Sequence, residues 1–403
     1  MDTPQIYTPQ IHTPQIHPCC SIVPPYLLTR LAKLDDPKFA RAAAAARDSL
    51  LRDSRIRQMR DATHPLAHPS ARSMPTRPPG ESDRTISDAG GLERLPGRPV
   101  RTEAQPAGTD PAVTEAYDGL GATQELFWKQ FGRDSIDNRG MPMDATVHYG
   151  QKYDNAFWDG ERMVFGDGDG QVFNRFTISP SVIGHELTHG VTQFTANLEY
   201  QGQSGALNES ISDVFGALVE QNLKGQSASE ASWLIGEGLF TEQVEGIALR
   251  SMKAPGTAYN DDVLGKDPQP DSMAGYVETD DDNGGVHLNS GIPNRAFYLV
   301  AEAVGGNAWE TPGRIWYDTL TGSALSPQSD FAAFAAATAD AAARLYGNGS
   351  PAHDAVLLAW QTVGVVTDVP APLPSTTGTP SAAGIPLPPT ASGTGGRPAG
   401  TAA

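Results

Sequence analysis

Two histidines four residues apart, His185 and His189, flank an acid in the stretch HELTH. On a helix, positions i and i+4 share a face, so both imidazoles can reach one metal ion. Glu186 is turned about 100° from His185, where a carboxylate can take the proton of a metal-bound water. The motif favours a catalytic metal centre over its alternative, a solvated helix with two incidental histidines.

A third ligand is needed, because a catalytic zinc usually has three protein ligands and one open position. The metzincin pattern requires glycine and histidine at positions that are threonine here, Thr192 and Thr195, so that class is excluded. The other option is a carboxylate on a following helix, and Glu209 lies 20 residues beyond His189. Asp213, one turn further, suits an outer carboxylate that fixes the tautomer of a ligating histidine.

These residues carry a family resemblance. The stretch HELTHGVTQFTANLEYQGQSGALNESISDVFGALVE resembles the thermolysin family of zinc endopeptidases. The likeness continues in YDNAFWDGERMVFGDGDG at 153–170, RSM at 250–252 and DNGGVHLNSGIPNRAFYL at 282–299. Zinc aminopeptidases with a third-ligand glutamate are similar, but their spacing is one residue shorter. A catalytically silent binding protein on the same fold is the other alternative.

The elements that would position this site form two lobes. Short apolar runs and tight turns over residues 93–190 predict a β-rich lobe that ends in the HELTH helix. Residues 191–366 are mostly of helical period, as in GALNESISDVFGALVEQNL. Together with the resemblance, this predicts an α+β fold, the two-lobed thermolysin-like catalytic domain, with the zinc site on the helix between the lobes.

The resemblance implies a role for each residue of the metal centre. His185, His189 and Glu209 would hold one zinc ion. Glu186 would be the general base that activates water and passes the proton to the leaving amine. Asp213 would orient His185.

Three further residues would serve the transition state. The resemblance implies that Tyr200 and His287 donate hydrogen bonds to the oxyanion and that Asp282 orients His287. Taken singly, Tyr200 could be an ordinary packing residue and His287 a buried loop histidine.

Peptide binding would use Asn155 and the backbone of Ala156, which the resemblance implies to hold the substrate as an added strand. Arg250 would bind the substrate carbonyl just past the scissile bond. The family preference is for cleavage before bulky apolar residues, so protein and peptide substrates are expected.

The calcium expectation departs from the family. Its larger members carry a paired calcium site, and Glu220 and Glu237 match part of it. Neighbouring positions are Ser181, Ser232 and Leu234, which leaves too few anionic oxygens for two hard cations. We therefore expect at most one weak calcium.

The front of the chain resembles the short propeptide of protealysin-like members through PPYLL at 24–28. We expect an inhibitory prosegment over 21–73, followed by a linker or processing segment over 74–92. Self-cleavage is expected at Ser73–Met74 or Thr85–Ile86. Residues 1–100 carry a net charge of +4 and residues 101–403 carry −22, so electrostatic docking is expected.

Composition limits the remaining possibilities. The net charge of −18 over 403 residues disfavours nucleic acid as a partner, and no apolar run is long enough for a membrane. A monomer is expected.

The two ends of the chain are expected to be disordered, namely the TPQI repeats of the leader, 1–20, and the Pro/Thr-rich tail, 367–403. Cys19 or Cys20 could cap the zinc in a precursor, against plain free thiols. No signal peptide is visible; the family favours secretion, and the cytoplasm is the alternative.

Overall fold

The structure is a computed structural model that describes residues 21–62 and 77–366. All of these lie in the first of two units, Met1–Thr367. The expected leader and tail, the two cysteines and the Ser73–Met74 bond lie outside the described residues. No helix in the described part is long and apolar enough to cross a bilayer.

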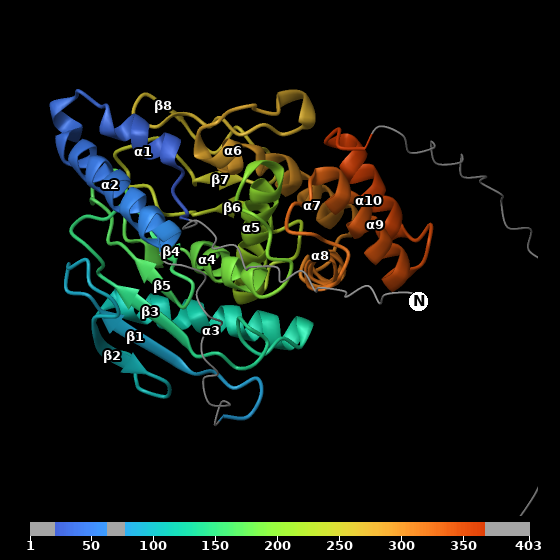
Figure 1. The fold of residues 1–403 in the computed structure, drawn as a ribbon, viewed down its shortest axis with the longest axis horizontal. Helices are drawn as coiled ribbons and strands as arrows, with labels where there is room; N and C mark the ends of the chain where they lie inside the picture. The colour runs from blue at the N-terminus through green and yellow to red at the C-terminus, as the bar shows by residue number, and fades with distance from the viewer. Residues whose placement is uncertain (1–20, 63–76, 367–403) are drawn as a thin grey trace, which may run out of the picture. The chain divides into compact units, whose positions relative to one another are not determined.

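A five-stranded sheet forms the first lobe, in the order β2-β1-β3-β5-β4 (Figure 1). Strands β1, β3 and β5 run parallel, while β4 is an antiparallel edge strand beside β5. The strands are β1 Arg84–Asp88, β2 Arg98–Thr102, β3 Met143–Val147, β4 Ala156–Trp158 and β5 Arg162–Phe165. The other four strands therefore leave one edge of β4 unpaired, where a further strand can add.

The linker expected over 74–92 differs from the structure, because it contains strand β1. This strand pairs with β2 on one side and β3 on the other, and Ile86 is fully buried. A bond at Thr85–Ile86 inside a paired strand is closed to a protease unless the sheet opens. Strand β1 was missed because the short polar segment RTISD shows little alternation.

A helix that the sequence reasoning missed, α3 (Pro111–Phe131), packs against β1 and β3. Its ends carried clear signals. Asp110 caps its first turn by accepting from two backbone N–H groups, Pro111 occupies the first helical position, and Gly132 ends it in the left-handed conformation. The lobe over 93–190 is thus mixed, not simply β-rich.

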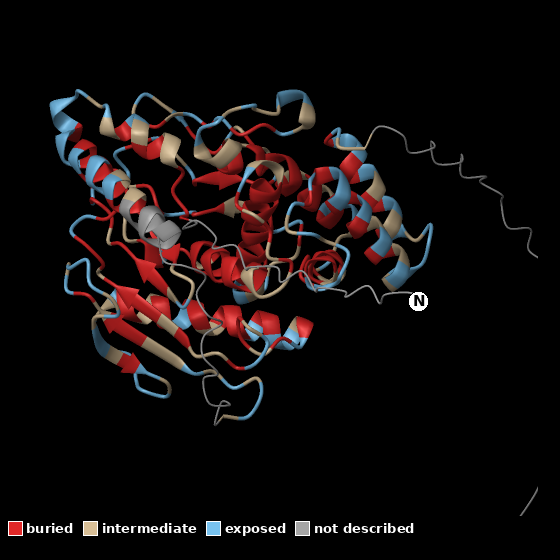
Figure 2. Cartoon of the chain, in the orientation of Figure 1, coloured by how far each residue is buried: buried red, intermediate tan, exposed pale blue. Residues whose placement is uncertain are grey.

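The centre of the molecule is the helix pair α4 (Pro180–Gln193) and α5 (Gly202–Lys224). Figure 2 shows both helices buried along most of their length. Gly216 lets them approach closely, since a Cβ there would lie 2.4 Å from the Ser181 carbonyl oxygen. Substitution of this glycine would push the two ligand-bearing helices apart.

The second lobe is helical, as predicted. Its helices α7, α8, α9 and α10 pack around Trp316 and Trp360, whose stacked rings lie 6.3 Å apart. The remaining elements are η2 Phe176–Ile178, β6 Leu234–Ile235, β7 Arg250–Ser251, β8 Asn260–Asp261, β9 Gly265–Lys266, η3 Met273–Gly275, α6 Asp282–Asn289, α7 Gly291–Val304, α8 Thr311–Thr321, α9 Phe331–Tyr346 and α10 Pro351–Thr362.

The expected prosegment folds as α1 (Pro25–Ala32), η1 (Pro37–Phe39) and α2 (Ala40–Ala62), drawn in blue in Figure 1. Leu27, Leu28 and Leu31 of α1 are buried in the main hydrophobic core, shared with α4 and α5. The Ala- and Arg-rich stretch that begins at Ala40 forms α2.

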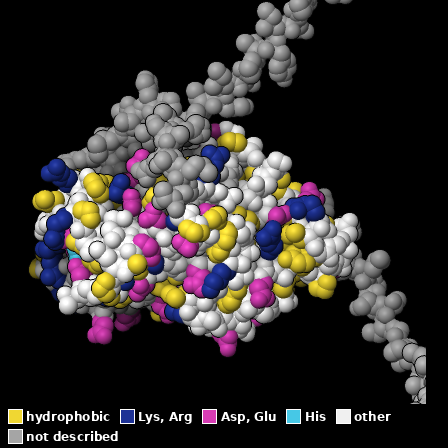
Figure 3. All heavy atoms as spheres, turned by 90° about the horizontal axis from the view of Figure 1, so that it is seen from below, with side chains coloured by type: hydrophobic (Ala, Val, Ile, Leu, Met, Phe, Trp, Pro, Cys, Tyr) yellow, Lys and Arg dark blue, Asp and Glu magenta, His cyan; other side chains and the backbone are white. Residues whose placement is uncertain are grey.

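Charge contributes locally to the docking of the prosegment. Arg52 of α2 forms an ion pair of 2.6 Å with Glu93, and Arg30 of α1 donates to the carbonyl oxygens of Asp262 and Val263. Acidic, basic and apolar side chains are interspersed on the face in Figure 3.

Candidate active site

Helices α4 and α5 bring together the three residues predicted as metal ligands. The Nε2 atoms of His185 and His189 lie 3.0 Å apart, and each is 3.5 Å from a carboxylate oxygen of Glu209. Their candidate ligand atoms all fall within 4.8 Å of one another, and all three residues are buried. The i, i+4 spacing on α4 sets the two imidazoles side by side, and α5 supplies the carboxylate.

The residues present fit a zinc ion. Two imidazole nitrogens and one carboxylate are a common catalytic zinc set, and Oε2 of Glu209 is buried without a hydrogen-bond partner. Burial lowers the pKa of His189 to about 3, so this imidazole is neutral and its lone pair is available.

Outer partners fix both histidine rings. Nδ1 of His185 lies 2.7 Å from Asp213. Nδ1 of His189 lies 2.8 Å from Oδ1 of Asn208 and 3.1 Å from the Ser212 hydroxyl. The sequence reasoning missed Asn208 and Ser212, although they share a face of α5 at i and i+4, beside Glu209.

Asp213 is held in a network with no exposed member. It accepts two hydrogen bonds from Arg250, at 2.8 and 2.9 Å, and one of 2.8 Å from Asn294, which the sequence reasoning missed. Burial alone would raise the pKa of Asp213, but the Arg250 guanidinium and the His185 imidazole hold it below its usual range. The carboxylate therefore stays ionised to orient His185.

Glu186 lies beside the ligands and does not join them. Its Oε2 accepts from the backbone N–H of Trp158 at 3.0 Å, and its Oε1 is buried without a hydrogen-bond partner. Burial, and then the charge of Glu209, raises the pKa of Glu186 well above its usual range. A carboxylate that gains a proton readily suits a general base.

His287 and Tyr200 both lie against the ligand Glu209. The Tyr200 hydroxyl donates to Glu209 and lies 3.3 Å from Nε2 of His287. Asp282 accepts from Nδ1 of His287 at 2.7 Å and from its backbone N–H at 3.0 Å. Burial opposes protonation, yet Asp282 and Glu209 raise the pKa of His287 to about 9, so it is a cationic donor.

The expected strand-binding residues hold a segment of the chain itself. The Ile22 N–H donates to the Ala156 carbonyl oxygen at 3.2 Å, and the Val23 N–H donates to Oδ1 of Asn155 at 2.9 Å. Ser21 forms an antiparallel bridge with Phe157 of β4. The prosegment thus enters the site as an added strand.

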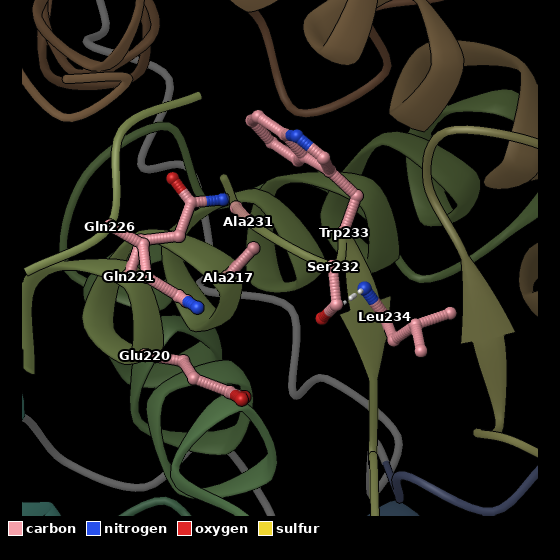
Figure 4. Close-up of a pocket in the computed structure, with 8 residues that line it drawn as sticks. All are labelled: Ala217, Glu220, Gln221, Gln226, Ala231, Ser232, Trp233 and Leu234. Atoms are coloured by element: carbon pink, nitrogen blue, oxygen red, sulfur yellow. Dashed lines mark hydrogen bonds between the residues drawn. The ribbon is translucent and has the colours of Figure 1, made fainter. Parts of the chain in front are cut away.

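Of the two expected calcium residues, Glu220 lies near the C-terminal end of α5 and lines a pocket (Figure 4), and Glu237 follows β6. Lys224 reaches both carboxylates, with its Nζ 2.5 Å from Glu220 and 3.8 Å from Glu237. Ser232 and Leu234, which bring no anionic oxygen, line the same pocket as Glu220. A lysine ammonium thus supplies positive charge between the two acids.

The fold and this centre define a metallohydrolase with a histidine–histidine–carboxylate site. Two family models match the chain: "Thermolysin metallopeptidase, catalytic domain" over residues 85–193 and "Thermolysin metallopeptidase, alpha-helical domain" over 196–365. The chain belongs to the thermolysin family of metallopeptidases, and it is a hydrolase.

Several relatives agree in sequence and structure. An "Extracellular metalloprotease" of Pectobacterium carotovorum is 50% identical over 86% of this chain and 97% of its own. The thermostable neutral protease NprT of Geobacillus stearothermophilus is 42% identical over 64% of this chain and 46% of its own. The solved structure of the precursor of protealysin, a metalloproteinase from Serratia proteamaculans, is 50% identical, covers 86% of this chain and 100% of that one, and has a TM-score of 0.78.

Proposed function

We propose that the chain is the secreted precursor of a zinc endopeptidase that cuts before bulky apolar residues and removes its own prosegment. One observation carries the proposal. The buried Glu186 carboxylate has an oxygen without a partner beside the three ligand residues, and the main chain of Ser21–Val23 lies across them. Export is supported by relatives named extracellular.

The residues divide the reaction among them. His185, His189 and Glu209 would hold the zinc, which when bound polarises the scissile carbonyl and lowers the pKa of a water. Glu186 takes the proton of that water and delivers it to the leaving nitrogen. His287 donates to the oxyanion as charge develops, and with Tyr200 it sits where two donors would converge.

Binding of an extended peptide uses the edge of β4. Asn155 and Ala156 pair with its main chain, and Arg250 binds the carbonyl that follows the scissile bond. The Ile22 side chain is fully buried within the main core, which supports an apolar pocket on that side of the cut. Asp213 restrains Arg250 through two hydrogen bonds.

The test compares two forms of one leucine-containing peptide, with the amino terminus blocked or free. Processed protein should cut both forms before leucine. A chelator should abolish cleavage, and Glu186→Gln should lower it about 10²–10⁴-fold while zinc stays bound. Cleavage of the free form alone would show an aminopeptidase, and zinc bound without cleavage of either would show a silent binding protein.

A further inference from the structure

The peptide bond between Ser21 and Ile22 lies at the reacting groups. The Ser21 carbonyl oxygen is 3.1 Å from Nε2 of His287. The Ile22 N–H donates to the Ala156 carbonyl oxygen at 3.2 Å and also lies against the Glu186 carboxylate. The Ile22 carbonyl oxygen accepts from Nη1 of Arg250 at 3.0 Å. Carbonyl, amide nitrogen and following carbonyl thus meet the groups that would act on a substrate.

The next bond along the chain does not fit this role. The Ile22 carbonyl is taken by Arg250, and the Val23 N–H donates to Asn155, away from Glu186. Because strand pairing fixes the register, a shift by one residue would move every one of these contacts. The register therefore selects one bond, Ser21–Ile22.

We propose that the enzyme hydrolyses its own Ser21–Ile22 bond and releases residues 1–21, while the prosegment from Ile22 onward stays docked. The proposal rests on the proposed function. Water adds to the Ser21 carbonyl carbon and Glu186 takes its proton. The bond from that carbon to the Ile22 nitrogen breaks as the proton moves to this nitrogen. The first products are a Ser21 carboxylic acid and an Ile22 amine, and transfer of the acid proton to the amine leaves a carboxylate and an ammonium group.

The trimmed prosegment keeps most of its hold. Contacts that do not involve the leader survive the cut: Val23 with Asn155, the Ile22 carbonyl with Arg250, and the buried leucines of α1. The new Ile22 ammonium would face the Glu186 carboxylate, an attraction between opposite charges in a buried site. Trimming is thus separate from activation, and the shortened precursor remains inhibited.

The leader carries its own control. Ile6, Ile11 and Ile16 each follow glutamine in the repeats, so each is a bond before isoleucine. If sequence preference alone directed the cut, these bonds would be cleaved as readily as the one before Ile22. Placement by the docked prosegment predicts a single early cut at Ser21–Ile22.

The experiment follows the intact mass and amino-terminal sequence of the purified full chain after zinc is added. Wild type should give Ile22 as its first new amino terminus, at a rate independent of protein concentration, with activity on a blocked peptide still low. Ile22→Asp should slow the cut at least tenfold, whereas Ile22→Leu should be cut at about the wild-type rate. The Glu186→Gln precursor should stay intact.

Three results would overturn this proposal alone. One is an early amino terminus at Ile6, Ile11 or Ile16 in place of Ile22, and another is the same cut in the Glu186→Gln precursor. The third is an intact residue 1 in a sample that cleaves the blocked peptide, which leaves the proposed endopeptidase standing. A zinc-loaded sample that cleaves neither itself nor the peptide overturns both.

Discussion

The metal centre and the prosegment contact lie at the same site, but the first is formed by side chains and the second by main-chain groups of the prosegment. The metal centre is made of side chains: His185, His189 and Glu209 and the groups that orient them. On the prosegment side, the contact over Ser21–Val23 is made by main-chain N–H and carbonyl groups, which every residue except proline possesses. The first depends on residue identity, while the second depends on how the flanking helices hold the strand in place.

The difference fits the proposed inhibition by the prosegment and its proposed later release. Main-chain pairing gives modest free energy per contact, about 0.5–1.5 kcal/mol for each hydrogen bond. The buried leucines of α1, and Asp53 of α2 through its contact with Asn155, add to the docking of the prosegment. A cut in the chain between prosegment and body then leaves contacts that can dissociate, whereas zinc ligands within α4 and α5 cannot.

The largest effect should come from breaking the metal centre at Glu209→Gln. Losing an outer partner of a ligand costs about 10–100-fold in metal affinity, so losing a ligand should cost more. Zinc content after dialysis against a weak chelator, measured by atomic absorption, should fall towards zero together with activity. The control is Glu220→Gln on the same helix, which should keep its zinc. Full zinc retention in Glu209→Gln would show that another residue completes the site.

A smaller effect should come from breaking the prosegment contact at Asp53→Asn. Asp53 on α2 accepts from the Tyr153 hydroxyl at 2.5 Å and from Nδ2 of Asn155 at 3.0 Å, so it orients the residue that binds Val23. Loss of a buried hydrogen-bond partner costs about 1–3 kcal/mol, and about 1.4 kcal/mol corresponds to tenfold. Residual activity of the full precursor on a small blocked peptide should rise about tenfold.

The matched control for this prediction is Asp48→Asn, an exposed position on the same helix. It removes the same charge from α2 without touching Asn155, so residual activity should stay at the wild-type level. Equal increases in both variants would mean that the net charge of α2, not the orientation of Asn155, governs docking.

The same contrast explains what could be predicted from the sequence. Helical periodicity fixes which side chains share a face, so it predicted that His185 and His189 can reach one ion. Glu209 lies on another helix, and its assignment as the third ligand rested on the family resemblance. His287, Tyr200 and Asp282 come from segments far apart in the chain, and only the family resemblance placed them together. Their roles remain predictions, now with compatible geometry.

Main-chain contacts left no such pattern. The sequence Ser21–Ile22–Val23 does not predict a strand that pairs with β4, because the hydrogen bonds of this segment do not use its side chains. Strand β1 was missed for a similar reason, since one buried apolar residue, Ile86, is too little to show a period of two. Helix α3 is different, because Asp110–Pro111 at its start and Gly132 at its end are helix signals that can be recognised in the sequence.

A second histidine–carboxylate cluster, which is more exposed than the active site, tests how burial affects the strength of such interactions. His148 lies between Asp167 and Asp110, 2.9 Å from each, as His287 lies beside Asp282, but the two acids are about two-fifths exposed. Asp167 and Asp110, against the opposing effect of burial, raise the pKa of His148 to about 9. A histidine whose pKa is higher in the folded than in the unfolded protein stabilises the fold. This stabilisation is fully present at a pH below the unfolded pKa of about 6.5, and it disappears as the pH rises through the folded pKa of about 9.

His148→Asn should therefore lower the free energy of unfolding near pH 6 by about 1 kcal/mol or less, because exposed partners are screened by solvent. The loss should vanish near pH 10. Asparagine tolerates the left-handed conformation of this position, φ 55°, so backbone strain is not added. Thermal unfolding at both pH values measures the difference, with His353→Asn on α10 as the control. A loss that is equal at the two pH values would show that packing, not charge, is responsible.

The smallest effect is expected for calcium. Lys224 places a tethered ammonium between Glu220 and Glu237, so an added ion must displace it and still find the six to eight oxygens that calcium takes. Millimolar calcium should thus raise the melting temperature of the zinc-loaded protein by less than about 2 °C, the shift for roughly 1 kcal/mol or less in a protein this large. Lys224→Gln frees both carboxylates and should increase the calcium response, with magnesium as the ionic control. A large rise specific to calcium in the wild type would mean that the lysine does not occupy the site in solution.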